Sequence, residues 1–244
     1  MSDKFKSISH TLKKLLGLKY SPVVVSCLES APESITKDRL RICSAILEAA
    51  RGRTLELSKA NNLCLGANIH LGFHKVRSDK IRAALNKFVV EGEKLFCSQQ
   101  ALENLELQLP VPPDNSNKRF VLTPLEKTTI DPQLVIFVVD PEAACRLLTL
   151  LTFTNGDMPE IKIGGPTCRL AVIYPLVSAK ANISFYDYTS RRLSKIDKDK
   201  LLVSIPFVEL ARMMENIDKC CAGKARMELP VEFRSLSKKK LGTK

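Results

Sequence analysis

The chain has 244 residues, a mass of 27.2 kDa and a formal net charge of +12. Its hydrophobic fraction of 45% and mean hydropathy of −0.03 are those of a soluble globular protein with a substantial core. No apolar run reaches the roughly 18–20 residues that cross a bilayer, which excludes a membrane-spanning protein. The short run Leu15–Leu18 is also too brief for the core of a signal peptide, so we expect a cytoplasmic protein.

The net positive charge is compatible with binding to nucleic acid. It is dispersed along the chain, however, and its densest part is the run Lys238–Lys240. Aromatic residues make up only 6% of the chain and tryptophan is absent, which leaves few platforms on which bases stack. A solvated basic surface is therefore the favoured interpretation, and the sequence specifies neither a partner nor an oligomeric state.

Eight cysteines are spread over the chain, at positions 27, 43, 64, 97, 145, 168, 220 and 221. Without an export signal we expect no disulfide framework, because disulfides are rare in reducing compartments. No Cys-x-x-Cys pair is present, so the sequence supports neither a zinc ribbon nor a thioredoxin motif. Most of these residues are expected to be small buried apolar side chains. Any metal site needs ligands that the fold brings together.

Apolar periodicity and turn residues predict alternating helices and strands in the first half. The expected elements are an amphipathic helix over 3–18, a strand over 22–28, a helix over 37–51 capped by Thr36, a short strand over 54–57, and helices near 78–90 and 99–105. The proline-rich stretch 110–124 is predicted to be a linker or long loop.

The second half opens with a continuous apolar run typical of a buried strand. The expected elements are a strand over 134–139, a helix from Pro141 to about 151–154 capped by Asp140, an extended piece at 161–163, a helix from the Cys168 segment to 175, a strand over 181–185, a turn at 189–192, a strand over 201–205 and a final helix to about 217.

Both halves show the same order of a strand, a helix, a glycine, an extended piece and a cysteine segment. Eleven residues separate Gly52 from Cys64, and eleven also separate Gly156 from Cys168. We predict an α+β fold, with a mixed sheet, packed helices and two pseudo-duplicated halves. The expected organisation is one domain over 1–244, with halves at about 20–109 and 125–219 and a basic tail at about 235–244.

Two cysteine segments, 61–73 and 164–171, are the candidate site. A helix N-terminus lowers the pKa of a cysteine and favours the thiolate. A thiolate binds soft metals or acts as a nucleophile. The predicted metal ligands are Cys43, Cys64 and Cys168, with Cys145 as a fourth candidate, and the cofactor is a metal ion, an iron–sulfur cluster or another small group.

Three further residues are predicted to bind the cofactor. Gly66 would let backbone approach a ligand closely, Gly165 would expose backbone amides to an anion, and Arg191 would bind a carboxylate or phosphate. A tight turn at Gly165 and simple solvent exposure of Arg191 are the structural alternatives.

Two other functions remain open from the sequence. One is an enzyme with Cys64 as nucleophile and His70 or His74 as base. The other is a nucleic-acid-associated or scaffold protein that acts through its basic surface. Steeply salt-dependent binding is expected of a nucleic-acid protein, whereas the enzyme requires an imidazole within hydrogen-bond reach of Cys64.

Several short motifs occur in a specific order along residues 10–220. They are Ser21-Pro22-Val23-Val24-Val25, Arg41-x-Cys43, Gly52, Asn62-x-Cys64-x-Gly66, the Cys168 segment and Leu201–Pro206. In these the chain resembles domain-of-unknown-function family 169, the uncharacterised ArCR family of archaea and bacteria, which implies no established activity. The resemblance also implies a Cys-x-Gly-x-Arg motif before the last strand. Here Arg191 is kept but Asp187 stands in place of the cysteine, as a replacement ligand or as the mark of a lost site.

Overall fold

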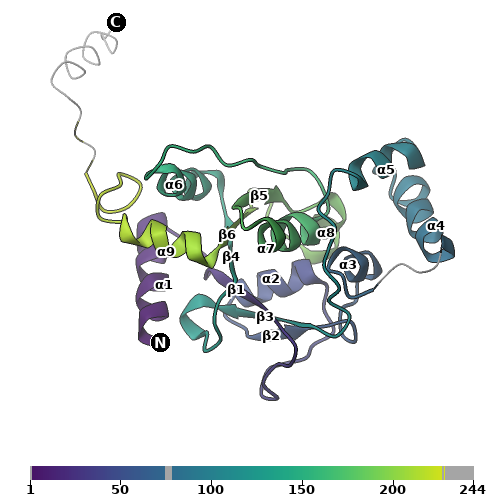
Figure 1. The fold of residues 1–244 in the computed structure, drawn as a ribbon, viewed down its shortest axis with the longest axis horizontal. Helices are drawn as coiled ribbons and strands as arrows, with labels where there is room; N and C mark the ends of the chain where they lie inside the picture. Colours follow the sequence, from purple (N-terminus) through teal and green to yellow (C-terminus); the bar gives the residue numbers. More distant parts are fainter. Residues whose placement is uncertain (1, 75–78, 227, 229–244) are drawn as a thin grey trace, which may run out of the picture.

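The computed structural model describes residues 2–74, 79–226 and 228, in which helices and strands alternate around one six-stranded sheet (Figure 1). In chain order the elements are α1 (Ser2–Leu16), β1 (Val23–Leu28), α2 (Ile42–Ala50), β2 (Leu55–Leu57), α3 (Leu65–His70), α4 (Asp79–Lys87), η1 (Phe88–Gly92), α5 (Gln99–Glu106), β3 (Arg119–Pro124), η2 (Leu125–Lys127), β4 (Leu134–Val139), α6 (Pro141–Thr152), η3 (Arg169–Ile173), α7 (Tyr174–Ser178), β5 (Asn182–Phe185), α8 (Tyr188–Ser194), β6 (Leu201–Pro206) and α9 (Phe207–Glu215). The basic tail predicted at about 235–244 lies outside the described residues.

The strands run in the order β2-β3-β1-β4-β6-β5, and neighbouring strands pair antiparallel. Parallel pairing occurs as two isolated bridges, from Thr36 to Leu55 and from Leu40 to Asn62. Helices cover both faces of the sheet, so the central strand β4 is buried along its whole length. Burial on both faces is the reason that β4 has a continuous apolar sequence rather than an alternating one.

Each face of the sheet carries its own core. Side chains of a strand point alternately to the two faces, so Val23 and Val25 join one cluster while Val24 joins the other. The first cluster packs under α2, α3 and η3, and the second under α1, α6 and α9. Figure 1 shows α1, α6 and α9 grouped on one side of the molecule, whereas α4 and α5 project as a lobe from the other.

The predicted α+β class is confirmed. Helices α2 and α6, which the predicted repeat would equate, cover opposite faces of the sheet. This arrangement does not show an internal duplication, which stays a prediction. Within the described ranges, no helix is both long enough and apolar enough to cross a bilayer.

Three local predictions were wrong. Residues 119–124, expected in a loop, form β3 inside the sheet, because the continuous apolar run after Arg119 outweighs the nearby prolines. Residues 189–192, expected as a turn, lie within α8, whose first turn Asp187 caps. Helix α2 begins at Ile42 rather than near residue 37, and the Thr36 carbonyl accepts a hydrogen bond from the Glu56 N–H instead of capping a helix.

A carboxylate clamp holds α1 against the sheet. The Glu126 carboxylate accepts hydrogen bonds from Ser9 Oγ at 2.8 Å, Lys13 Nζ at 2.6 Å and Ser21 Oγ at 2.7 Å. Burial raises the pKa of Glu126, but these hydrogen bonds and one from the backbone outweigh burial and lower that pKa to about 2.

Replacing Glu126 with glutamine is expected to lower the free energy of unfolding at neutral pH by about 2 kcal/mol, because Lys13 loses its partner in a partly exposed site. The folded pKa of about 2 lies below the ordinary value of 4.5. The stabilisation is therefore complete above that ordinary value and disappears as the pH falls toward the folded pKa. Urea denaturation of both proteins at neutral and acidic pH measures this difference, and equal stability at neutral pH would contradict the role of the clamp.

Candidate functional site

The Cys64 thiol lies at the start of α3, in a segment fixed by buried amide side chains. Asn62 Nδ2 donates to Asn68 Oδ1 at 2.7 Å and to the Cys64 carbonyl at 3.1 Å. Cys64 is the N-cap residue of α3, and its Sγ accepts the Ala67 N–H at 3.4 Å. The thiol is half-buried and points toward the open amides of the first helical turn.

A second set of polar contacts fixes the residue that precedes Cys168. Asp187 Oδ2 accepts hydrogen bonds from the Thr167 N–H at 2.9 Å and from Thr167 Oγ1 at 2.6 Å. Its other oxygen, Oδ1, accepts the Ser190 N–H at 2.7 Å and so caps α8. Asp187 thus fastens the residue before Cys168 to the start of α8, and both of its oxygens are engaged in doing so.

The Cys43 thiol comes from α2, on the side of the site that faces α8. Its Sγ lies 3.4 Å from Ser194 Oγ, which is also 2.8 Å from Ser44 Oγ. The hydroxyl of Tyr186 is buried without a hydrogen-bond partner and interacts electrostatically with Cys43. Burial raises the pKa of Tyr186 far above its ordinary value.

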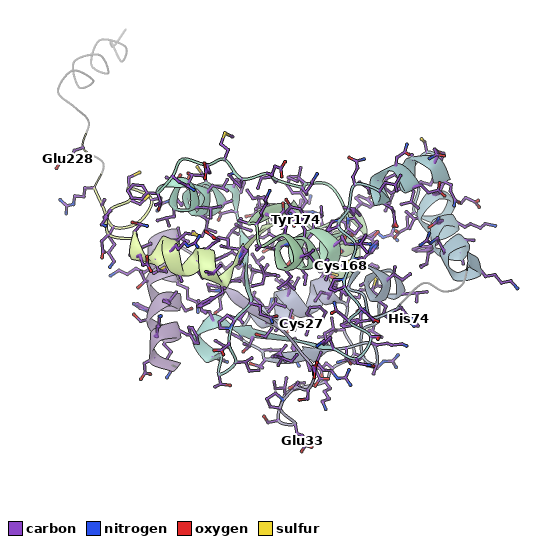
Figure 2. All side chains as sticks on the ribbon, in the orientation of Figure 1. Cys27, Glu33, His74, Cys168, Tyr174 and Glu228 are labelled. Atoms are coloured by element: carbon purple, nitrogen blue, oxygen red, sulfur yellow. The ribbon has the colours of Figure 1, made fainter. Side chains whose placement is uncertain are left out.

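The fold brings these three cysteines into one region. Cys43 and Cys168 are buried in the same apolar cluster, Cys64 packs against it, and α3 lies against η3. The electrostatic environment of the Cys168 thiol includes Cys64, Asp187 and Cys43, in decreasing order of effect. Figure 2 places Cys168 among the covering helices near α3. In contrast Cys145, the fourth candidate, is exposed on α6 over the opposite face of the sheet.

The prediction that a helix N-terminus favours the thiolate was wrong for two of these cysteines. Burial raises the pKa of Cys64, and the Ala67 N–H and the charge of Arg41 offset that effect only in part. Burial raises the pKa of Cys168 well above its ordinary value. The cost of desolvating a thiolate therefore exceeds the effect of the helix ends, and both groups are neutral thiols at pH 7. Within the described residues, no three Cys, His, Asp or Glu side chains are already arranged to hold a metal ion.

Arg169, which directly follows Cys168, was missed as a functional candidate. It is only 6% exposed, and its guanidinium contacts the Pro110 carbonyl and lies with Nη2 3.2 Å from His70 Nδ1. Its Nε has no hydrogen-bond partner. Burial first, and then the charge of Arg169, lower the pKa of His70 to about 4, so His70 is uncharged at neutral pH. The signal in the sequence was an arginine at the start of an otherwise apolar helical segment.

A family model for the uncharacterised ArCR family, domain of unknown function 169, matches residues 11–216. The chain belongs to the ArCR family. No curated protein and no solved structure matches it. The ArCR region contains all three thiols together with Asp187 and Arg169, and it runs from within α1 to the end of α9.

His70 and His74, the two predicted bases of this ArCR chain, are not hydrogen-bonded to Cys64 in the structure. The Arg169 guanidinium donates to Nδ1 of His70, so the proton of the neutral ring is on Nε2. His74 is exposed, and its backbone N–H donates to the Asn68 carbonyl at 3.0 Å. Cys64 Sγ accepts a backbone N–H, and neither of these imidazoles is hydrogen-bonded to it in the structure. The structure therefore offers no general base next to Cys64 among these two residues.

The predicted cofactor-binding residues have structural contacts of their own. A Cβ at Gly66 would meet no atom within 4 Å, so no backbone approaches it closely. A Cβ at Gly165 would lie 3.0 Å from Leu170 Cδ1, so this glycine allows Leu170 to pack. The guanidinium of Arg191 donates to four backbone carbonyls, those of Tyr186, Asp197, Lys198 and Lys200. Cofactor binding by these three residues stays a prediction.

Proposed function

We propose that this ArCR protein binds a thiophilic metal ion or a metal–sulfur cluster through Cys43, Cys64 and Cys168. The supporting observation is that three thiols from different elements lie in or against one apolar cluster and interact electrostatically with one another. Thiolates are the ligands that copper(I), zinc and iron–sulfur clusters prefer. The apolar surroundings would exclude water from the bound group.

The charges around the thiols suit such a ligand set. Each thiol must lose its proton to become a ligand, and three thiolates around a divalent ion leave a net negative charge. Arg41 interacts electrostatically with Cys64, and Arg169 follows Cys168 in the chain. Within the part of the chain that the structure describes, neither guanidinium has an ion pair with a carboxylate. Their positive charges are available to balance the thiolates.

Binding requires two side chains to turn. The Cys43 thiol now contacts Ser194, and the Cys64 thiol accepts the Ala67 N–H. Rotation about the Cα–Cβ bonds, between staggered conformers, would release both sulfurs toward Cys168. We therefore expect the site to form as the metal binds, which couples metal affinity to local order around α3.

Anaerobic purification followed by metal and acid-labile sulfide analysis tests the proposal, together with a titration of the metal-free protein with Co²⁺. Thiolate coordination gives intense sulfur-to-cobalt charge-transfer bands, and a tetrahedral site adds visible absorption. We expect these bands to saturate at one Co²⁺ per chain. A folded protein that is purified without metal and shows no bands with Co²⁺ would refute the proposed function.

Metal affinity is expected to rise steeply with pH. Burial keeps the pKa values of Cys64 and Cys168 above the ordinary range, so both thiols carry protons at neutral pH. The metal must displace a proton from each thiol ligand, so Cys64 and Cys168 alone should increase its apparent affinity by about 100-fold per pH unit until the thiols titrate, and a third thiol ligand would steepen this further. Competition titrations with a chelator of known protonation behaviour measure this slope. A pH-independent affinity would exclude thiol ligation by both residues.

A further inference from the structure

Arg169 is a buried positive charge without a negative partner. Only 6% of the surface of Arg169 is exposed, and within the described residues no carboxylate forms an ion pair with it. Glu106 on α5 acts on it electrostatically but is exposed and forms no ion pair with it. A guanidinium is not deprotonated in proteins, so Arg169 stays charged although it is buried.

The contacts of the guanidinium do not satisfy it. One terminal nitrogen donates to the Pro110 carbonyl and the other to the neutral ring of His70, both of which are uncharged acceptors. The remaining nitrogen, Nε, is buried and has no acceptor. A buried charge that lacks an opposite charge is costly, and so is an unsatisfied buried donor. A bound ligand that supplies an anionic acceptor would explain why Arg169 is buried without a partner for its charge or its Nε.

We infer that Arg169 binds an anionic oxygen group, a carboxylate or a phosphate, of a small ligand at the thiol site. Guanidinium is the side chain best suited to these groups, because its N–H donors match their oxygens in charge and geometry. Arg169 begins η3 directly after Cys168 and interacts electrostatically with that thiol, so its anion would lie near Cys168. The inference rests on the proposed function only for the identity of the group bound by sulfur, since the contact with the anion needs no metal.

The test uses the metal-free protein and three simple anions, inorganic phosphate, sulfate and acetate, each at the same ionic strength as a chloride reference. Thermal unfolding and calorimetric titration are compared for the wild type and for Arg169→Met, which keeps an unbranched apolar side chain in place of the arginine stem and removes the guanidinium. We expect at least one anion to raise the Tm of the wild type, and its affinity to fall at least tenfold in the variant. Acetate and phosphate distinguish a carboxylate from a phosphate ligand.

The same variant separates a ligand-binding role from a structural one. If the charge serves a ligand, Arg169→Met in chloride should be as stable as the wild type or more stable, because an unpaired buried charge is gone. Arg146→Met is the control: Arg146 lies on α6, which packs on the opposite face of the sheet, and it loses its hydrogen bonds to Glu142 and to the Leu15 carbonyl, so its Tm should fall while its response to the anion persists. If Arg169→Met does not fold, Arg169→Lys should bind the anion more weakly than the wild type.

Two results would overturn the inference. One is a wild type that responds to none of the three anions, and the other is an equal response in the Arg169 variants. The Co²⁺ titration of the wild type is read separately. Cobalt bands without an anion response would support the proposed metal site and refute the anion site. An anion response without cobalt bands would support the anion site and refute the proposed metal site.

Discussion

Replacing Cys64 with serine is expected to reduce the sulfur-to-cobalt charge-transfer intensity at saturation by about a third, because one of three thiolate ligands is lost, and to weaken zinc binding by at least about 100-fold. Serine keeps the size of the side chain, but its hydroxyl is a hard ligand that does not ionise at neutral pH. Cys64 is the best position for this test because it is half-buried, whereas Cys43 and Cys168 are buried. A hydroxyl at those two positions would itself destabilise the fold by about 1–3 kcal/mol if it lacked a partner.

Cys145→Ser is the matched control for this experiment. Cys145 is exposed on α6, and α6 packs on the face of the sheet opposite to the thiol site. The control should bind Co²⁺ like the wild type, with the same spectrum and stoichiometry. Retention of the full charge-transfer intensity in Cys64→Ser would show that this residue is not a ligand. Circular dichroism of both variants establishes that any loss is not caused by unfolding.

Replacing Gly72 with alanine is expected to lower the free energy of unfolding by about 3–5 kcal/mol. Gly72 has a φ of +78°, and a Cβ there would lie 2.0 Å from the Pro113 carbonyl oxygen. That contact is with backbone, so it cannot be relieved by a side-chain rotation. The Gly72 carbonyl also accepts the Asn115 N–H at 2.9 Å, and Asn115 Nδ2 donates to the Leu71 carbonyl at 2.8 Å.

The same substitution should disturb the thiol site. The close approach at Gly72 fixes the chain before β3 against the end of α3, and the Pro110 carbonyl in that chain contacts Arg169. Gly66→Ala is the control, since a Cβ at Gly66 meets nothing within 4 Å and α3 should gain up to about 1 kcal/mol from it. Chemical denaturation of both variants measures the difference, and a Gly72→Ala protein as stable as the wild type would contradict the close approach.

Much of the secondary structure could be predicted because it depends on local patterns. The helix at the N-terminus follows from apolar residues at helical spacing, and the Asp140-Pro141 pair marks the start of α6, where Asp140 accepts the Ala143 N–H at 2.9 Å. The run 134–139 is apolar at every position, as a strand buried on both faces requires. These signals lie within a few residues and need no partner.

The α+β class, the ArCR membership and the choice of Cys43, Cys64 and Cys168 as candidates all follow from the amino-acid sequence. The fold was needed to show that residues 119–124 enter the sheet between β1 and β2, because strand pairing joins segments far apart in the chain. It also decided that Arg169 is buried without a carboxylate, and that the Cys64 and Cys168 thiols are neutral. The pKa of a thiol depends on the water that neighbouring elements exclude from it, and no local pattern contains that quantity.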